Sequence, residues 1–245
     1  MSHLASSSSA PYRRTSAISP GIRAMVVGAW WFAVMGLLVK LSGRRLPSSQ
    51  IVLVRAALTL ALRYWAVRQA GVPSIWGAQR TLLLVRGGLG AVGINCFYYS
   101  LVHLPLGEAT LIQYTNPILA IILAVLWVGQ RVRPIVFHLP LVTFPTAIPF
   151  ASANWLMPTG WEWLLLLGVG MSTQLAQTSM TRGLQAETAV RATTAGYLQI
   201  VFAGIWGALL LGERPSVWTL AGAAVIVVSA LVLALGKRRA EIGDE

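Results

Sequence analysis

Charge, and negative charge above all, is scarce in this sequence. Only 11% of the 245 residues are charged, and 7 Asp and Glu stand against 19 Lys and Arg. A soluble domain has a charged fraction nearer a quarter, and 56% of this chain is hydrophobic, so the composition is that of a polytopic membrane protein. The Lys and Arg residues separate apolar runs and do not cluster with stacking aromatic residues, so no nucleic-acid partner is expected.

Cysteine, histidine and catalytic motifs are also rare or missing. A single cysteine, Cys96, excludes an intrachain disulfide, and the three scattered histidines have no metal-ligand spacing. The sequence contains no HExxH zinc motif, no GxSxG nucleophile motif and no glycine-rich phosphate loop. We therefore expect no enzymatic activity, no catalytic residues, no metal site and no cofactor.

Long uncharged runs are what the sequence has instead. The stretch from Arg86 to Arg133 contains two of them, 21 residues at 87–107 and 22 residues at 109–130. A helix needs about 20 such residues to cross the hydrocarbon layer of a bilayer. The run His103–Glu108 contains a proline and a glycine and is expected to form the elbow of this transmembrane hairpin.

The same criterion predicts eight transmembrane helices in the whole chain. The second is interrupted by Arg55, Arg63 and Arg68, and the fifth contains four prolines. If all eight cross, thirteen Lys and Arg lie on the cytoplasmic side, Arg63 and Arg68 among them, and four lie outside. This ordinary positive-inside bias disappears if the fifth segment does not cross. The predicted helices cover residues 24–39, 51–70, 87–107, 109–130, 134–161, 163–181, 192–212 and 215–236.

An internal repeat relates the two halves of the chain. A shift of 83 positions lays Tyr114–Arg131 on Tyr197–Arg214, with six identities in eighteen positions. A shift of 79 superposes two polar triples, each with the i, i+3, i+4 spacing that places side chains on one face of a helix. The triples are Asn95, Tyr98 and Tyr99, and Gln174, Gln177 and Thr178. The helices that carry them are expected to run in opposite directions, so the repeat is inverted, as in alternating-access carriers.

The predicted fold class is therefore an all-α membrane protein, a polytopic bundle of about eight helices from an inverted structural repeat. Residues 22–133 and 134–236 would form the two halves, each with four helices. Residues 1–21, which are mostly serine-rich, are expected to form a disordered cytoplasmic tail, and residues 237–245 a second cytoplasmic tail.

The two polar triples are the candidate lining of a substrate path, because amides and phenols at mid-bilayer can hydrogen-bond polar solutes without carrying a proton. Interhelical hydrogen bonding, in which these groups only satisfy one another, is an equal alternative. A second tier, expected to gate or to pack, lies nearer the membrane surfaces. It consists of Gln113, Tyr114, Asn116, Thr194, Tyr197 and Gln199.

A few charges enter or adjoin the predicted spans. Arg55 lies a few residues inside one, where it either snorkels to the outer headgroups or faces the pathway and attracts carboxylates. Three glutamates at helix ends are expected to cap helices or to pair with nearby arginines. They are Glu108, Glu187 and Glu213, with Arg191 and Arg214 as partners. No acidic residue falls at the midplane, which argues against proton coupling through a buried carboxylate.

Four stretches of the sequence resemble EamA-type carriers of the drug/metabolite transporter superfamily. They are Arg86-Gly87, the elbow LPLGEA at 104–109, the Pro117-centred helix that ends VGQR at 128–131, and YLQIVFAGIWGALLLGERPSVWTLAGAAVIV at 197–227. The similarity covers roughly residues 22–236, and the LLLGE run with its terminal helix is the most specific part. The resemblance implies a five-plus-five inverted repeat of helices that exports amino acids and other small metabolites.

Compared with that family pattern, two helices are missing. After Arg131-Val-Arg-Pro134 the chain passes directly to what resembles the seventh helix, and Gln130 replaces a glutamate whose counterpart, Glu213, is retained. The leading hypothesis is an alternating-access carrier that exports a small-molecule substrate across the lipid bilayer, expected in a bacterial inner membrane with both termini cytoplasmic. The alternative is a shortened, transport-inactive protein whose open side is covered by a second copy, as a homodimer, or by another partner.

Overall fold

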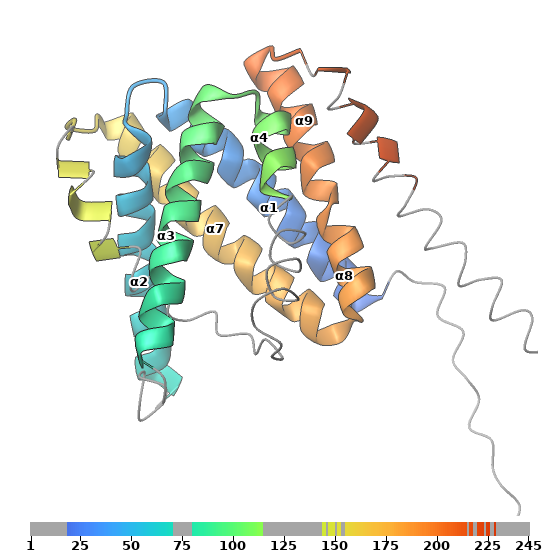
Figure 1. Cartoon of the computed structure of the whole chain (residues 1–245), viewed down its shortest axis with the longest axis horizontal. Coiled ribbons are helices and arrows are strands. Elements are labelled where there is room, and N and C mark those ends of the chain that lie inside the picture. Colours follow the sequence, from blue (N-terminus) through green and yellow to red (C-terminus); the bar gives the residue numbers. More distant parts are fainter. Residues whose placement is uncertain are drawn as a thin grey trace, which may run out of the picture.

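The computed structural model describes residues 19–70, 80–114, 144–145, 147–149, 151–152, 155–214, 216–217, 220–222, 224–225 and 228. In this part of the chain all regular structure is helical, and the long helices pack side by side as a bundle (Figure 1). The helices are α1 (Pro20–Ser42), α2 (Ser48–Ala70), α3 (Arg80–His103), α4 (Leu106–Gln113), α7 (Gly160–Ala186), α8 (Ala189–Gly196) and α9 (Leu198–Leu211).

Helix α1 packs against α7, α8 and α9 and so joins the two halves of the chain (Figure 1). It begins at Pro20, whose fixed φ suits a first helical turn, and Ser19 Oγ accepts a hydrogen bond from the Ile22 N–H at 3.3 Å. Gly28 permits the close approach to α7. A Cβ atom there would lie 2.8 Å from Met180 Cγ and 3.1 Å from the Ala176 carbonyl oxygen.

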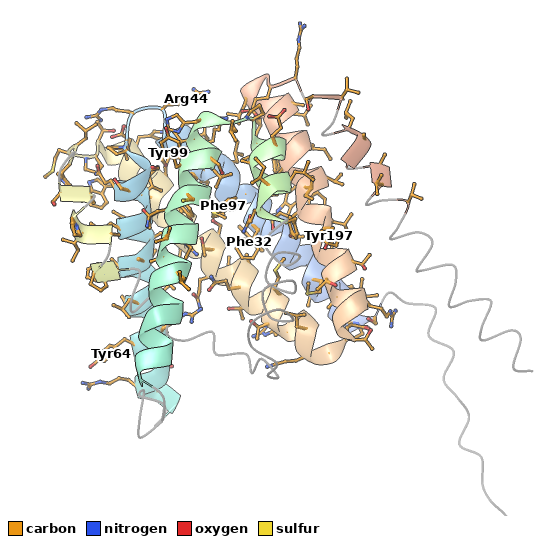
Figure 2. The ribbon with its side chains drawn as sticks, in the orientation of Figure 1. Phe32, Arg44, Tyr64, Phe97, Tyr99 and Tyr197 are labelled. Atoms are coloured by element: carbon orange, nitrogen blue, oxygen red, sulfur yellow. The ribbon has the colours of Figure 1, made fainter. Side chains whose placement is uncertain are left out.

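The apolar core lies where α1, α2, α3, α4, α7 and α9 meet. Tyr98 is its largest fully buried side chain. Phe32 and Phe97 are partly buried and pack against the same cluster from α1 and α3 (Figure 2). Other core members are Met35, Val39, Leu101, Leu106, Leu166, Val169 and Ala203.

In each half of the chain a long helix ends and a short helix follows it. Helix α3 ends at His103 and α4 follows it, and α7 ends at Ala186 and α8 follows it. Helices α4 and α8 each have 8 residues, and each ends at a tyrosine in the right-handed helical conformation, Tyr114 or Tyr197. The shift of 83 positions carries α4 onto α8 and Tyr114 onto Tyr197. The two short helices run in opposite directions (Figure 1).

Several helix boundaries differ from the prediction. The predicted elbow at 103–108 is narrower, because only Leu104 and Pro105 are non-helical and Glu108 belongs to the first turn of α4. Helix α7 extends beyond the predicted 163–181 at both ends. The predicted helix 192–212 is divided at Tyr197 into α8 and α9. The predicted span 109–130 lies outside the described residues from 115 onward, and 134–161 and 215–236 are described only in pieces.

Two described stretches are long and apolar enough to cross a membrane by length and composition alone, Pro20–Ser42 and Arg191–Leu211. The second of these runs through α8 and α9. Helices α2, α3 and α7 have 23, 24 and 27 residues, which is also long enough, but they carry more polar side chains. Those polar side chains form the candidate site.

Candidate functional site

Tyr98 connects three helices at the centre of the described bundle. Only 1% of its surface is exposed, and its hydroxyl donates to the Met35 sulfur of α1 at 3.3 Å. The Arg55 guanidinium of α2 lies over its ring, with Cζ 5.3 Å from the ring centroid, a cation–π contact. Arg55 therefore points into the bundle, and the expectation that it snorkels to the outer headgroups is wrong.

The structure does not bring Asn95 and Tyr99 together with Tyr98. Asn95 is half-buried, and its Nδ2 donates to the Ala91 carbonyl of its own helix at 2.9 Å. Tyr99 is 58% exposed and stacks on His103 with centroids 4.0 Å apart, near the end of α3 (Figure 2). Neighbouring residues are about 100° apart around a helix, so burying Tyr98 turns Tyr99 outward. The predicted triple of α3 is split.

The triple of α7 is split in the same way. Gln177 Oε1 accepts a hydrogen bond from Arg63 Nη2 of α2 at 2.7 Å. Gln174 Oε1 is buried and has no hydrogen-bond partner within the described part of the chain. Thr178 is exposed, and its hydroxyl donates to the Gln174 backbone carbonyl at 2.8 Å. Two of the three side chains therefore face the interior of the bundle.

Helix α2 supplies three polar groups, of which sequence reasoning singled out only Arg55. Arg63 was expected among the cytoplasmic cations, but it lies inside α2 and bonds Gln177. Arg55, Thr59 and Arg63 are spaced i, i+4, i+8, which places them along one stripe of the helix. The Thr59 side chain is 3% exposed. The spacing is present in the sequence, but the count of charges on the two sides of the membrane assigned Arg63 to the cytoplasmic surface.

The second tier contains a contact between the two halves. The Tyr114 hydroxyl lies 2.7 Å from the Gly196 carbonyl oxygen and 2.9 Å from Gln199 Oε1, so it can donate to either acceptor. The Tyr114 and Tyr197 rings are 5.0 Å apart between centroids. These two tyrosines are equivalent under the shift of 83 positions, so repeat-related side chains of the two halves meet here. Asn116 lies outside the described residues, and Gln113 Oε1 is buried with no hydrogen-bond partner among the described residues.

An ion pair joins three helices at one end of the bundle. Lys40 Nζ of α1 lies 2.7 Å from Glu213 Oε1, just beyond α9, and also donates to the Leu104 carbonyl. The Leu106 N–H of α4 donates to Glu213 Oε2 at 2.7 Å. Pro105 at the N-cap of α4 has no side-chain acceptor, so Glu213 supplies one at the positive end of the helix dipole. The expectation that Glu213 caps a helix is confirmed, but its ion-pair partner is Lys40 and not Arg214. We call this group the Lys40–Glu213 clamp.

The same end of the bundle carries a second ion pair. Arg45, in the α1–α2 loop, pairs with Glu162 at 2.7 Å, and Glu162 also accepts from the Thr159 N–H at 2.7 Å. The backbone hydrogen bond from Thr159, followed by the Thr159 hydroxyl and Arg45, holds the pKa of the Glu162 carboxyl below its usual value. Glu162 is therefore ionised at neutral pH and caps the N-terminus of α7.

The opposite end is tied together by Glu187. Its carboxylate accepts a hydrogen bond from Ser19 Oγ, the N-cap of α1, and pairs with Arg191 of α8 at 2.9 Å. The pairing of Glu187 with Arg191 is the one expected from the sequence. The N-terminus of α1 is thus attached to the junction of α7 and α8.

Two repeat-related helical units that meet along polar and tyrosine contacts are the architecture expected of the class of membrane transporters. The particular family follows from comparison with known proteins. The EamA-like transporter family matches the chain twice, over residues 19–148 and 135–235. The chain belongs to this family, as the sequence resemblance predicted, and is an integral multi-pass membrane protein with two EamA repeats. The two matches share residues 135–148, around the predicted junction of the halves.

Three relatives are named as transport proteins, and each aligns over most of this chain and most of its own length. The pseudopaline exporter of Pseudomonas aeruginosa is 28% identical, over 90% of this chain and 98% of that protein. A probable transport protein of Saccharomyces cerevisiae is 26% identical over 78% of this chain and 79% of that protein. The S-adenosylmethionine uptake transporter of Rickettsia felis is 20% identical over 91% of this chain and 97% of that protein. No solved structure matches the chain.

Proposed function

We propose that this protein is an alternating-access carrier that exports small polar metabolites such as amino acids. The observation that carries the proposal is the contact of Tyr114 with Tyr197, 5.0 Å apart and equivalent in the repeat. A pseudo-two-fold axis at an interface of inverted repeats is where carriers of this kind hold their substrate and where their halves move against each other. Export follows the name of the 28% identical pseudopaline exporter.

The contacts at the two ends support a rocking movement of the halves. The Lys40–Glu213 clamp joins α1 and the α3–α4 junction of the first half to the end of α9 in the second. The Glu187 contacts join α1 to α7 and α8 at the other end. Ion pairs and hydrogen bonds at the membrane surface can exchange with water at modest cost, so each set can open in turn. We assign the Lys40–Glu213 clamp to the outer side of the membrane, because the positive-inside rule predicts that the loops at this end lie outside.

The residues that would bind the solute lie between these two ends. Tyr98, Gln174 and Gln177 face the interior from α3 and α7, and the second-tier residues Tyr114 and Gln199 lie at the interface of the halves. Interhelical hydrogen bonding accounts for some of these groups, because Gln177 already bonds Arg63. It does not account for Gln174, whose buried oxygen has no partner among the described residues. Gln174 is therefore the residue we assign first to substrate.

A flux measurement tests this proposal with adjacent residues as matched controls. Purified protein in proteoliposomes is loaded with single amino acids, and exchange with labelled external amino acid is measured. Tyr98→Phe and Gln174→Ala are expected to reduce exchange at least tenfold, because each removes a polar group from the interior. Tyr99→Phe and Thr178→Ala, the exposed neighbours in the same predicted triples, are expected to exchange normally.

A second function is favoured by one observation, the shortness of the chain. About 220 residues, 90% of 245, take part in the alignment of 279 positions with the pseudopaline exporter. About 59 positions of that alignment therefore have no residue of this chain opposite them, enough for two helices and their loops. A shortened protein that acts by association would show no exchange of any solute and a stable dimer in mild detergent. Exchange by monomeric protein would exclude it.

A further inference from the structure

Tyr114 and Tyr197 occupy the same position of the internal repeat, but their hydroxyl groups are bonded differently. The Tyr114 hydroxyl lies 2.7 Å from the Gly196 carbonyl oxygen and 2.9 Å from Gln199 Oε1, both in the second half of the chain. The Tyr197 hydroxyl makes no hydrogen bond with another described residue, although its ring lies against that of Tyr114. The contact is therefore asymmetric, because its hydroxyl bond runs only from the first half to the second.

In an inverted repeat such an asymmetry distinguishes two states. The halves have related sequences and lie upside down relative to each other, so an exchange of conformations between them turns a bundle closed at one end into a bundle closed at the other. Each bond that only one half makes then has a counterpart that only the other half makes. For the bond of Tyr114, the counterpart is a bond from Tyr197 to the first half.

The first half has an unmet acceptor at the required place. The shift of 83 positions carries Gly196 onto Gln113, which is the last residue of α4 and directly precedes Tyr114. Gln113 Oε1 is buried and has no hydrogen-bond partner in the part of the chain that the structure describes. A buried acceptor without a partner costs free energy, so a bond to Gln113 in another state contributes to the stability of that state.

The surroundings of Tyr197 allow its hydroxyl to change partner. Tyr197 lies between α8 and α9, so the two helices can change their relative direction at this residue. A Cβ atom at Gly196 would lie 3.4 Å from Met25 Cε and 3.7 Å from Met180 Cε, so methionine side chains pack against this junction. Methionine is unbranched and repacks readily, which lets the junction change shape without leaving a cavity.

We propose that Tyr114 and Tyr197 exchange hydrogen bonds as the two halves move. In the described state Tyr114 donates to the second half, and in the opposite state Tyr197 donates to Gln113 Oε1. This inference rests on the movement of the halves in the proposed carrier function, and it names contacts that stabilise each end state. The Lys40–Glu213 clamp is formed in the described state, so the Tyr114 bond accompanies closure of the clamp end and the Tyr197 bond accompanies its opening.

Removal of each hydroxyl tests the proposal, because phenylalanine keeps the ring contact and deletes only the hydrogen bond. The reporter is the rate at which a maleimide labels Leu106→Cys, in a Cys96→Ser background of the full-length protein in detergent, since Leu106 is buried beside the clamp. We expect labelling to be about two- to tenfold faster in Tyr114→Phe and about two- to tenfold slower in Tyr197→Phe, the range that one hydrogen bond produces in an equilibrium. Tyr99→Phe changes an exposed tyrosine of α3 and is the control that should not alter the rate.

The opposite signs of the two effects separate the proposal from a purely structural role. Tyrosines that only pack at the interface would loosen the bundle on losing a hydroxyl and would accelerate labelling in both variants, and that result would overturn the proposal. Equal rates in the wild type and both variants would overturn it as well. If Tyr114→Phe does not fold, Gln199→Leu removes an acceptor of the same bond and is expected to accelerate labelling in its place.

A double-mutant cycle tests Gln113 as the acceptor of Tyr197. Gln113→Leu removes Oε1 and keeps an apolar side chain of similar length, so it is expected to slow labelling as Tyr197→Phe does. In the Gln113→Leu background Tyr197→Phe should have no further effect, because both substitutions delete one bond. Additive effects of the two substitutions would remove Gln113 as the partner.

Solute flux in proteoliposomes separates this inference from the carrier function. Opposite shifts in the labelling rates of Tyr114→Phe and Tyr197→Phe, without flux of any solute, would support the exchange of hydrogen bonds and remove the carrier function. Flux through the wild type, with labelling rates that do not move in opposite directions, would keep the carrier function and remove the exchange of hydrogen bonds. Flux together with opposite shifts is the result that supports both.

Discussion

At the scale of single residues, glycine positions decide how closely two helices of this bundle can approach each other. At Gly28 a Cβ atom would lie 2.8 Å from Met180 Cγ and 3.1 Å from backbone atoms of α7, which cannot move aside as a flexible side chain can. Gly93 on α3 has nothing within 4 Å of such an atom. We expect Gly28→Ala to destabilise the protein by about 1–3 kcal/mol through overpacking. Gly93→Ala should not destabilise it.

Thermal unfolding of the two glycine variants in the same detergent measures the difference. Alanine is the better helix former, so propensity alone would stabilise both variants slightly. A lower unfolding temperature for Gly28→Ala only would therefore report contact between α1 and α7. Equal unfolding temperatures would mean that the two helices are not this close.

At the scale of elements, the capping of α7 predicts a pH dependence. The folded-state pKa of Glu162 lies below its usual value of 4.5, so folding stabilises the carboxylate form. Its stabilising effect is present above about pH 4.5 and is lost as the pH falls through the lower folded-state value. Carboxylates stay ionised between about pH 5 and about pH 7, so the difference in unfolding temperature between the wild type and Glu162→Gln should be constant over this range. The difference should shrink in stronger acid. A difference that grows as the pH falls would contradict this capping role.

The Lys40–Glu213 clamp predicts a second effect at the same scale. Leu106 is fully buried beside the clamp, so a cysteine in its place, in a Cys96→Ser background, should react slowly with a membrane-impermeant maleimide. Glu213→Gln removes the ion pair with Lys40 and weakens the cap of α4, and we expect labelling at position 106 to become several-fold faster. Glu187→Gln, at the opposite end, is the control and should not accelerate it. Equal labelling with and without Glu213 would show that the clamp does not hold this end closed.

Sequence reasoning located the helices and the repeat because both depend on regular spacing. The shift of 83 positions paired Tyr114 with Tyr197, and the structure shows that the same shift also relates the short helices that end at these tyrosines, α4 and α8. The lining residues were harder, because Tyr98 and Tyr99 are equivalent in a pattern search and only packing decides which is buried. Arg63 and Lys40 were missed for a different reason. Their partners, Gln177 and Glu213, are distant in the sequence, and no local spacing connects them.

At the scale of the whole molecule, the number of membrane crossings is the main prediction. The eight crossings predicted from the sequence are an even number, so they would return the C-terminus to the cytoplasm together with the N-terminus. Fusion of alkaline phosphatase or green fluorescent protein after Glu245 in a bacterial host measures this. We expect fluorescence and no phosphatase activity. Phosphatase activity would require an odd number of crossings and would remove the eight-helix arrangement.

The most direct test of the whole account is to lock the Lys40–Glu213 clamp during transport. Lys40→Cys and Glu213→Cys, combined in a Cys96→Ser background, are joined by a short cleavable bis-maleimide reagent, and solute exchange is measured in proteoliposomes before and after cleavage. If the two halves rock about the Tyr114 and Tyr197 contact, exchange stops in the cross-linked protein and returns when the link is cut. Undiminished exchange through fully cross-linked protein would contradict the movement on which the account depends.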